Sequence, residues 1–124
     1  MVNKIFLYLG AVLPLFWGVA HLFPTNSVVK GFGDISLDNR RIIIMEWIIE
    51  GGALIFVGVI IAAVTYVDPT NAVSKVIYVV AFIFLNILSV ISLMTGFKIN
   101  FIPFKLCPVI FTSSSILILL GNHL

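Results

Sequence analysis

Four long apolar segments, each of about twenty residues or more, constrain the fold of this chain more than any other feature. They cover Ile5–Phe23, Ile42–Val67, Val76–Phe97 and Phe101–Gly121. A helix needs about 20 apolar residues to cross the hydrocarbon core of a bilayer. Because lipid offers no partner for unpaired backbone N–H and C=O groups, segments of this length are expected to be helical. The sequence therefore predicts four transmembrane helices.

The composition supports the same conclusion. The chain has 124 residues, of which 61% are hydrophobic and 10% are charged, and its mean hydropathy is +1.23. Soluble domains carry about 25% charged residues, and the connections here are too short to form a separate soluble domain. We predict an all-α fold, a four-transmembrane-helix antiparallel bundle that forms a single domain over residues 1–124. Helices that follow one another in the sequence are expected to be antiparallel neighbours in space.

Polar residues, glycines and prolines predict local features of these helices. Residues 26–41 form the longest and most polar connection, and Asp38 is the predicted N-cap of the second helix. Glycines in that helix predict close packing against another helix; they are Gly51, Gly52 and Gly58. Pro14 frees the backbone carbonyl of Gly10 in the first helix. That first segment follows a lysine, as a signal peptide does, but its apolar run is long for one, and we expect a retained span.

Residue counts argue against several kinds of site. The single cysteine, Cys107, can form no internal disulfide and no CxxC redox or zinc site. A di-iron centre in a four-helix bundle needs four carboxylates and two histidines at depth, whereas this chain offers Glu46, Glu50 and His21 there. A bis-histidine haem is not expected, because His21 and His123 belong to opposite membrane faces. A mononuclear site from His21 and the two glutamates stays open as a minor alternative, but we assign no metal site.

No sequence motif identifies a catalytic residue or a cofactor, and both remain unassigned. The net charge is +2 and the chain has no basic run. Binding to nucleic acid is therefore not expected.

Glu46 and Glu50 carry the strongest functional signal. They stand one helical turn apart inside an otherwise apolar span, where a charged side chain costs roughly 2.5–3.5 kcal/mol. At this spacing two carboxylates also repel each other unless one keeps its proton or both meet a cation. Ionisable residues inside membranes are rare and usually functional, so the pair marks the candidate site.

Polar side chains from all four helices are expected in the same half of the membrane. At about 1.5 Å per residue, His21 lies near the membrane face that carries the loops after the first and third helices, which we call the loop side. Glu46 and Glu50 lie one to two turns inside the second helix from that side, and Asn86 lies near the middle of the third helix. This asymmetry predicts a cavity that opens to the loop side. The predicted ligand-binding residues are Glu50, Glu46, His21, Trp17, Trp47 and Asn86.

Structural roles would also explain some of these residues. Glu46 could extend to the surface and pair with a neighbouring arginine. His21 could stabilise the negative end of a helix dipole, and Trp17 and Trp47 could be interfacial anchors. Glu50 lies too deep to reach the surface in the same way as Glu46. It is therefore the central residue of the predicted site.

The first half of the chain resembles DoxX-like membrane proteins. The resemblance rests on the stretch Gly18-Val19-Ala20-His21-Leu22-Phe23-Pro24, a polar loop, and Glu50 beside glycines in the next helix. It implies a small four-helix membrane bundle and a link to quinone-associated redox complexes. The residues to which the resemblance extends are His21 and Glu50.

The predicted function is that of a multi-pass membrane protein whose intramembrane polar cavity binds a small amphipathic ligand, quinone- or lipid-like. Two alternatives stay open. The first is an intramembrane proton-transferring enzyme of isomerase type. The second is a structural subunit of a membrane complex, in which the carboxylates contact a membrane partner protein or a second copy of the chain.

Basic residues predict the orientation in the bilayer. The loop side carries Lys30, Arg40, Arg41, Lys98 and Lys105, and the other side carries Lys4 and Lys75. Cytoplasmic loops are enriched in lysine and arginine. We therefore expect the loops after the first and third helices in the cytoplasm and both termini outside.

Overall fold

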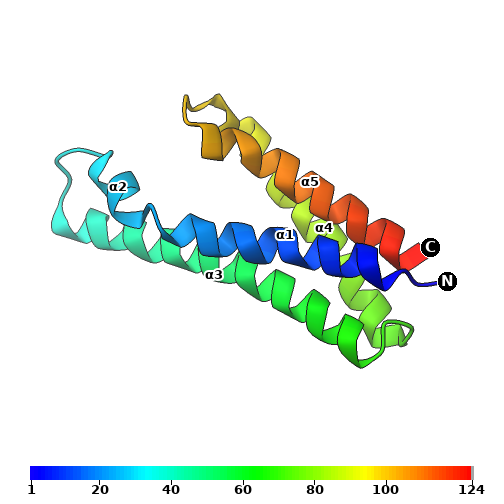
Figure 1. Cartoon of the computed structure of the whole chain (residues 1–124). Coiled ribbons are helices and arrows are strands. Elements are labelled where there is room, and N and C mark those ends of the chain that lie inside the picture. Colours follow the sequence, from blue (N-terminus) through cyan, green and yellow to red (C-terminus); the bar gives the residue numbers. More distant parts are fainter. Residues whose placement is uncertain (124) are drawn as a thin grey trace.

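The structure, a computed structural model, describes residues 1–123 and consists of helices joined by short connections (Figure 1). The elements are α1 (Lys4–Leu22), α2 (Thr25–Lys30), α3 (Leu37–Val67), α4 (Ala72–Met94), the 3-10 turn η1 (Gly96–Lys98) and α5 (Ile102–His123). Four helical stretches, α1, α3, α4 with η1, and α5, are long and apolar enough to cross a membrane. The predicted all-α fold with four transmembrane helices is therefore confirmed.

Side-chain caps define where three of the long helices begin. The Asn3 side chain accepts hydrogen bonds from the first turn of α1, and Asn71 does the same for α4. The N-cap of α3 is Ser36, whose Oγ accepts a hydrogen bond from Asn39 N at 3.1 Å. The prediction of Asp38 as the N-cap was wrong. Asp38 lies in the first turn of α3, where its carboxylate still favours the positive end of the helix dipole.

Helix α3 is longer than is needed to cross the hydrocarbon core of a bilayer. At about 1.5 Å per residue, the 31 residues of α3 extend about 46 Å, against about 30 Å for the hydrocarbon core. The first part of α3 therefore projects beyond the end of α1 at the loop side. The short helix α2, which lies within the predicted polar connection, packs against this projecting part (Figure 1).

Helix packing follows the spatial order α3, α1, α5, α4. The helix α1 packs against both α3 and α5, and α4 packs against α5. The consecutive helices α3 and α4 contact each other sparsely, so the expectation that all sequence neighbours pack side by side was wrong for this pair. At the end opposite to α2, the hydroxyls of Thr65 and Tyr78 join α3 and α4 by a hydrogen bond of 2.9 Å. Toward the α2 end, the α1–α3 pair and the α4–α5 pair separate (Figure 1).

Glycines allow α1 and α3 to approach each other closely. A Cβ atom at Gly58 of α3 would lie 2.5 Å from the carbonyl oxygen of Ala11, and one at Gly18 would lie 2.7 Å from that of Gly51. Gly52 faces open space, so only two of the three predicted packing glycines of α3 are used. A Cβ atom in these contacts would force the backbones apart, which explains why glycine occupies them.

A proline and a serine together satisfy one backbone carbonyl in the core. Pro14 lies inside α1 and has no N–H to donate to the carbonyl of Gly10, four residues earlier. The Ser114 hydroxyl of α5 donates to that carbonyl at 2.6 Å, and Ser114 is fully buried. The hydrogen bond joins α1 to α5 at the point where the ladder of α1 is interrupted.

Candidate functional site

The last turn of α1 and the middle of α3 place three predicted site residues in contact. The close approach of Gly18 to Gly51 sets His21 level with Trp47 and Glu50. Trp47 Nε1 donates to the backbone carbonyl of His21 at 2.8 Å, and carbonyls in a last helical turn have no partner within the helix. The two rings are stacked, with centroids 3.8 Å apart and 17° between their planes.

His21 also faces Glu50. Its Nε2 lies 3.6 Å from Glu50 Oε2, close enough for charge pairing but beyond hydrogen-bond length. The His21 side chain is 8% exposed and the Glu50 side chain is 55% exposed. Within residues 1–123, the buried His21 Nε2 atom has no hydrogen-bond partner. A buried polar atom without a partner is uncommon and calls for an explanation.

Two adjoining hollows lie at this end of the bundle. The smaller, of about 170 Å³, is lined by Trp17, Ala20, His21, Pro24, Trp47, Phe101, Pro103, Phe104 and Cys107. The larger, of about 590 Å³, is lined by Pro24, Ser27, Val28, Gly31, Phe32, Ile42, Ile43, Glu46, Trp47, Glu50, Ile99, Phe101 and Phe104. Both are bordered by Pro24, Trp47, Phe101 and Phe104. His21 therefore lines the smaller hollow, and the two glutamates line the larger one.

Aromatic rings separate and border the two hollows. Phe104 of α5 meets Trp47 edge to face at 6.0 Å between ring centroids, and Phe101 meets Phe104 at 5.4 Å. The contact between Trp47 and Phe104 connects α3 to α5. Phe32, Phe101 and Phe104 were not among the predicted site residues. The signal that could have identified them is their position in or next to the loop-side connections, at the depth of Trp47.

Three further side chains of this half have partners outside the contact of His21 with Glu50. Trp17 Nε1 donates to Cys107 Sγ at 3.4 Å, which places Trp17 between α1 and α5. Lys105 Nζ donates to the carbonyl of Phe97 at 2.8 Å and lies 4.9 Å from the centre of the Phe97 ring. Asn86 does not lie beside His21, Trp47 and Glu50. Its side-chain amide donates to the carbonyl of Phe82 on its own helix at 2.7 Å, and it lines neither hollow.

The pairing predicted as an alternative for Glu46 is absent from the described part of the chain. Arg41 lies 3.8 Å from Asp38, one turn earlier in α3, and Glu46 has no ion-pair partner there. Glu46 is exposed toward the larger hollow. The carboxylates and the imidazole together can accept, donate or exchange a proton with a bound group.

Comparison of the chain with protein-family models, with curated proteins and with solved structures finds no match. The reading of this site therefore rests on its own geometry.

Proposed function

We propose that the chain is a multi-pass membrane protein whose larger hollow binds a small amphipathic molecule, quinone- or lipid-like. The polar head of the ligand would lie at Glu50, beside His21 of the adjoining smaller hollow, and its apolar body would lie along Trp47, Phe101 and Phe104. One observation supports this proposal above the others. The buried His21 Nε2 has no partner and faces a carboxylate at the border of the larger hollow, so an incoming polar group would satisfy it.

The size and setting of the larger hollow agree with this proposal. Its volume of about 590 Å³ falls within the roughly 300–1,000 Å³ of small-molecule sites, which are mostly apolar with a few polar groups. It lies near the loop-side end of the spans, where the head of an amphipathic molecule is stable. A relation to DoxX-like proteins, and through it to quinone-associated complexes, is part of this proposal.

The His21–Glu50 geometry favours one alternative, an intramembrane enzyme that moves a proton on its ligand. An imidazole and a carboxylate 3.6 Å apart could both contact one polar group of the ligand and exchange a proton with it. In that case Glu50→Gln would abolish turnover while the ligand remained bound. The ligand-binding proposal instead expects the ligand to be lost.

Native mass spectrometry of the protein released from detergent tests the proposal. The wild type should carry an adduct with the mass of a small amphipathic molecule, and Glu50→Gln should lose most of it. Asp38→Asn is the matched control, because Asp38 lies on the same helix outside both hollows. An adduct kept equally by all three proteins, or its absence from the wild type, would contradict the proposal. Retention of a second protein instead would favour a structural subunit.

A further inference from the structure

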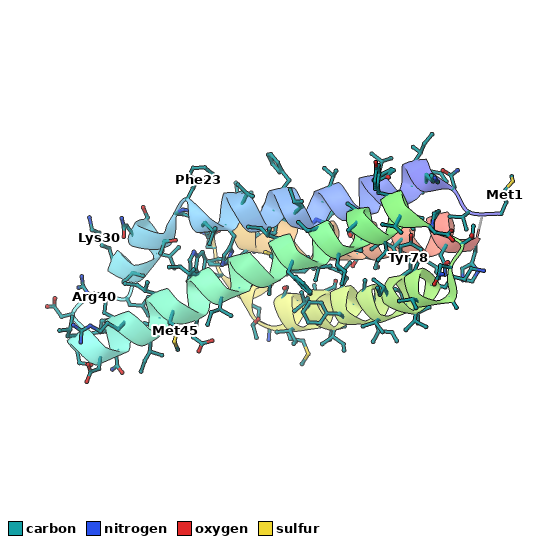
Figure 2. The ribbon with its side chains drawn as sticks, turned by 90° about the horizontal axis from the view of Figure 1, so that it is seen from below. Met1, Phe23, Lys30, Arg40, Met45 and Tyr78 are labelled. Atoms are coloured by element: carbon teal, nitrogen blue, oxygen red, sulfur yellow. The ribbon has the colours of Figure 1, made fainter. Side chains whose placement is uncertain are left out.

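The charge of the larger hollow is one-sided. Its only charged lining residues are Glu46 and Glu50, and no lysine or arginine within residues 1–123 lines either hollow. The basic residues of the same end lie elsewhere. Lys105 is held by the carbonyl and ring of Phe97, and Arg41 lies beside Asp38. Lys98 of η1 lines neither hollow, and Lys30 and Arg40 lie toward the outer end (Figure 2). Even with His21 protonated against Glu50, the carboxylate of Glu46 remains uncompensated.

Aromatic side chains make up much of the rest of the wall. The larger hollow is bordered by Phe32, Trp47, Phe101 and Phe104. The face of an aromatic ring carries partial negative charge and attracts cations within about 6 Å. Carboxylates together with several aromatic rings form a surface that attracts an organic cation and offers apolar contact to its hydrocarbon part.

His21, which lines the adjoining smaller hollow, adds an acceptor beside Glu50. In a neutral imidazole one ring nitrogen accepts hydrogen bonds. If this nitrogen is Nε2, it forms with Glu50 Oε2 a pair of acceptors 3.6 Å apart, and neither can satisfy the other. A group with an N–H and a positive charge would satisfy both.

We propose that the natural ligand class of the larger hollow is a lipophilic amine in its protonated form, with its nitrogen at Glu46, Glu50 and His21 and its hydrocarbon part against the aromatic residues. This inference rests on the proposed function and specifies its ligand. A fatty acid or a phospholipid fits less well. Each would bring a carboxylate or phosphate near two glutamates, with no basic side chain in the lining to compensate it. A neutral alcohol or quinone would leave the negative charge of Glu46 without a counter-ion.

Tryptophan fluorescence of the full chain in non-ionic detergent can test this assignment. The chain has two tryptophans. Trp47 lines the larger hollow, so a molecule bound there changes its environment, whereas Trp17 lines only the smaller hollow. The probes are three molecules built on an unbranched chain of ten carbons, N,N-dimethyldecylamine, decanol and decanoate. The amine should bind the wild type about tenfold or more tighter than either of the others, as expected for a partly desolvated charge pair.

Variants separate the charge from the shape of the hollow. The double variant Glu46→Gln/Glu50→Gln should lose this preference and bind the amine about as weakly as decanol. The charge-preserving Glu50→Asp should keep most of it. Asp38→Asn, which removes one acid from the same helix outside the hollow, should bind like the wild type. Equal melting temperatures would show that the variants fold.

The outcomes distinguish this inference from the proposed function. If decanol or decanoate binds the wild type as tightly as the amine, or if the double variant keeps the amine preference, the assignment of an amine is wrong while the amphipathic site stands. If lysophosphatidylethanolamine binds more tightly than the amine, a zwitterionic phospholipid replaces it as the ligand. If none of the probes changes the tryptophan signal, both this inference and the proposed ligand site fail.

Discussion

The Ser114 side chain supplies a hydrogen bond that the backbone of α1 lacks. The hydroxyl of Ser114 replaces the donor that Pro14 cannot supply to the Gly10 carbonyl. Both partners are buried between α1 and α5, so water cannot substitute for the lost group. A serine in a membrane helix usually donates to its own helix, and the sequence alone gives no reason to assign this one to another.

We expect Ser114→Ala to lower the stability of the protein by about 1–3 kcal/mol, because it leaves a buried carbonyl without a partner. Ser113→Ala is the control, since Ser113 is exposed on the same helix. Thermal unfolding in detergent would measure both. A midpoint for Ser114→Ala equal to that of Ser113→Ala would contradict the role assigned to this hydrogen bond.

Asp68 closes α3 outside the membrane and should make stability depend on pH. Its carboxylate accepts hydrogen bonds from the Thr70 hydroxyl at 2.6 Å and from Thr70 N at 2.9 Å. The Thr70 hydroxyl and then its amide lower the pKa of Asp68 below its ordinary value of 3.8. Because the pKa of Asp68 is lower in the folded than in the unfolded protein, its charged carboxylate stabilises the fold. This stabilisation is fully present above the pKa of the unfolded state and is lost as the pH falls through the pKa of the folded state.

The wild type should therefore be more stable than Thr70→Ala above about pH 5, and the difference should shrink at lower pH as Asp68 takes up a proton. Chemical unfolding of both proteins across this range would measure it. A difference that stays constant, or that grows at acid pH, would show that the Asp68–Thr70 contact does not carry the effect.

The packing of α1 against α3 is controlled by glycines on one face of α3. Gly58 meets the backbone of α1, whereas Gly52, less than two turns away, meets nothing within 4 Å. The two positions share a helix and a residue type and differ in their neighbours, which makes them a natural matched pair.

Gly58→Ala should destabilise the protein by about 1–3 kcal/mol, the usual range for overpacking, because its Cβ would lie 2.5 Å from the Ala11 carbonyl oxygen. Gly52→Ala should be neutral or stabilising by about 0.5–1 kcal/mol, since alanine favours a helix. Unfolding midpoints in detergent would separate them. The interpretation of this helix contact is wrong if both variants shift the midpoint in the same direction by similar amounts.

The number and approximate extent of the long helices could be predicted from the sequence, because each depends on local apolar composition, although α3 begins at Leu37, five residues before the predicted Ile42. The sequence also placed His21, Glu46 and Glu50 at one end, since depth follows from the rise per residue. It could not predict that α1 packs against α5, or that α3 and α4 contact each other only sparsely, because those contacts depend on which faces meet. For the same reason Asn86, near the right depth, turned out to bond to its own helix, and Phe104 was missed. That any of these residues bind a ligand stays a prediction.

At the scale of the whole molecule, residues 1–123 place the start of α1 and the last turn of α5 at one end and the basic loops at the other. Asn3 N donates to the carbonyl of Gly121 at 2.8 Å, which fixes the ends of α1 and α5 beside each other. Lys30 and Arg40 lie at the opposite end from Met1 (Figure 2). We propose, from the bias of basic residues, that the loop side faces the cytoplasm.

Cysteine labelling would decide this orientation. In a Cys107→Ser background, Lys75→Cys should react with a membrane-impermeant maleimide added to intact cells, and Lys30→Cys should react only after the cells are opened. The reverse pattern would invert the proposed orientation. Labelling of both sites in intact cells would contradict the transmembrane arrangement itself.

The two helix pairs lie farther apart at the α2 end than at the end of the termini (Figure 1), so a bilayer around the four spans would meet a broader protein in one leaflet than in the other. In such a bilayer the protein would act as a wedge, with its broad end in the leaflet of the two hollows. A wedge relieves lipid packing stress where its wide end lies on the convex face of a bend. We therefore expect the chain to concentrate on membrane tubes and buds that curve toward its termini, and to be depleted from flat regions.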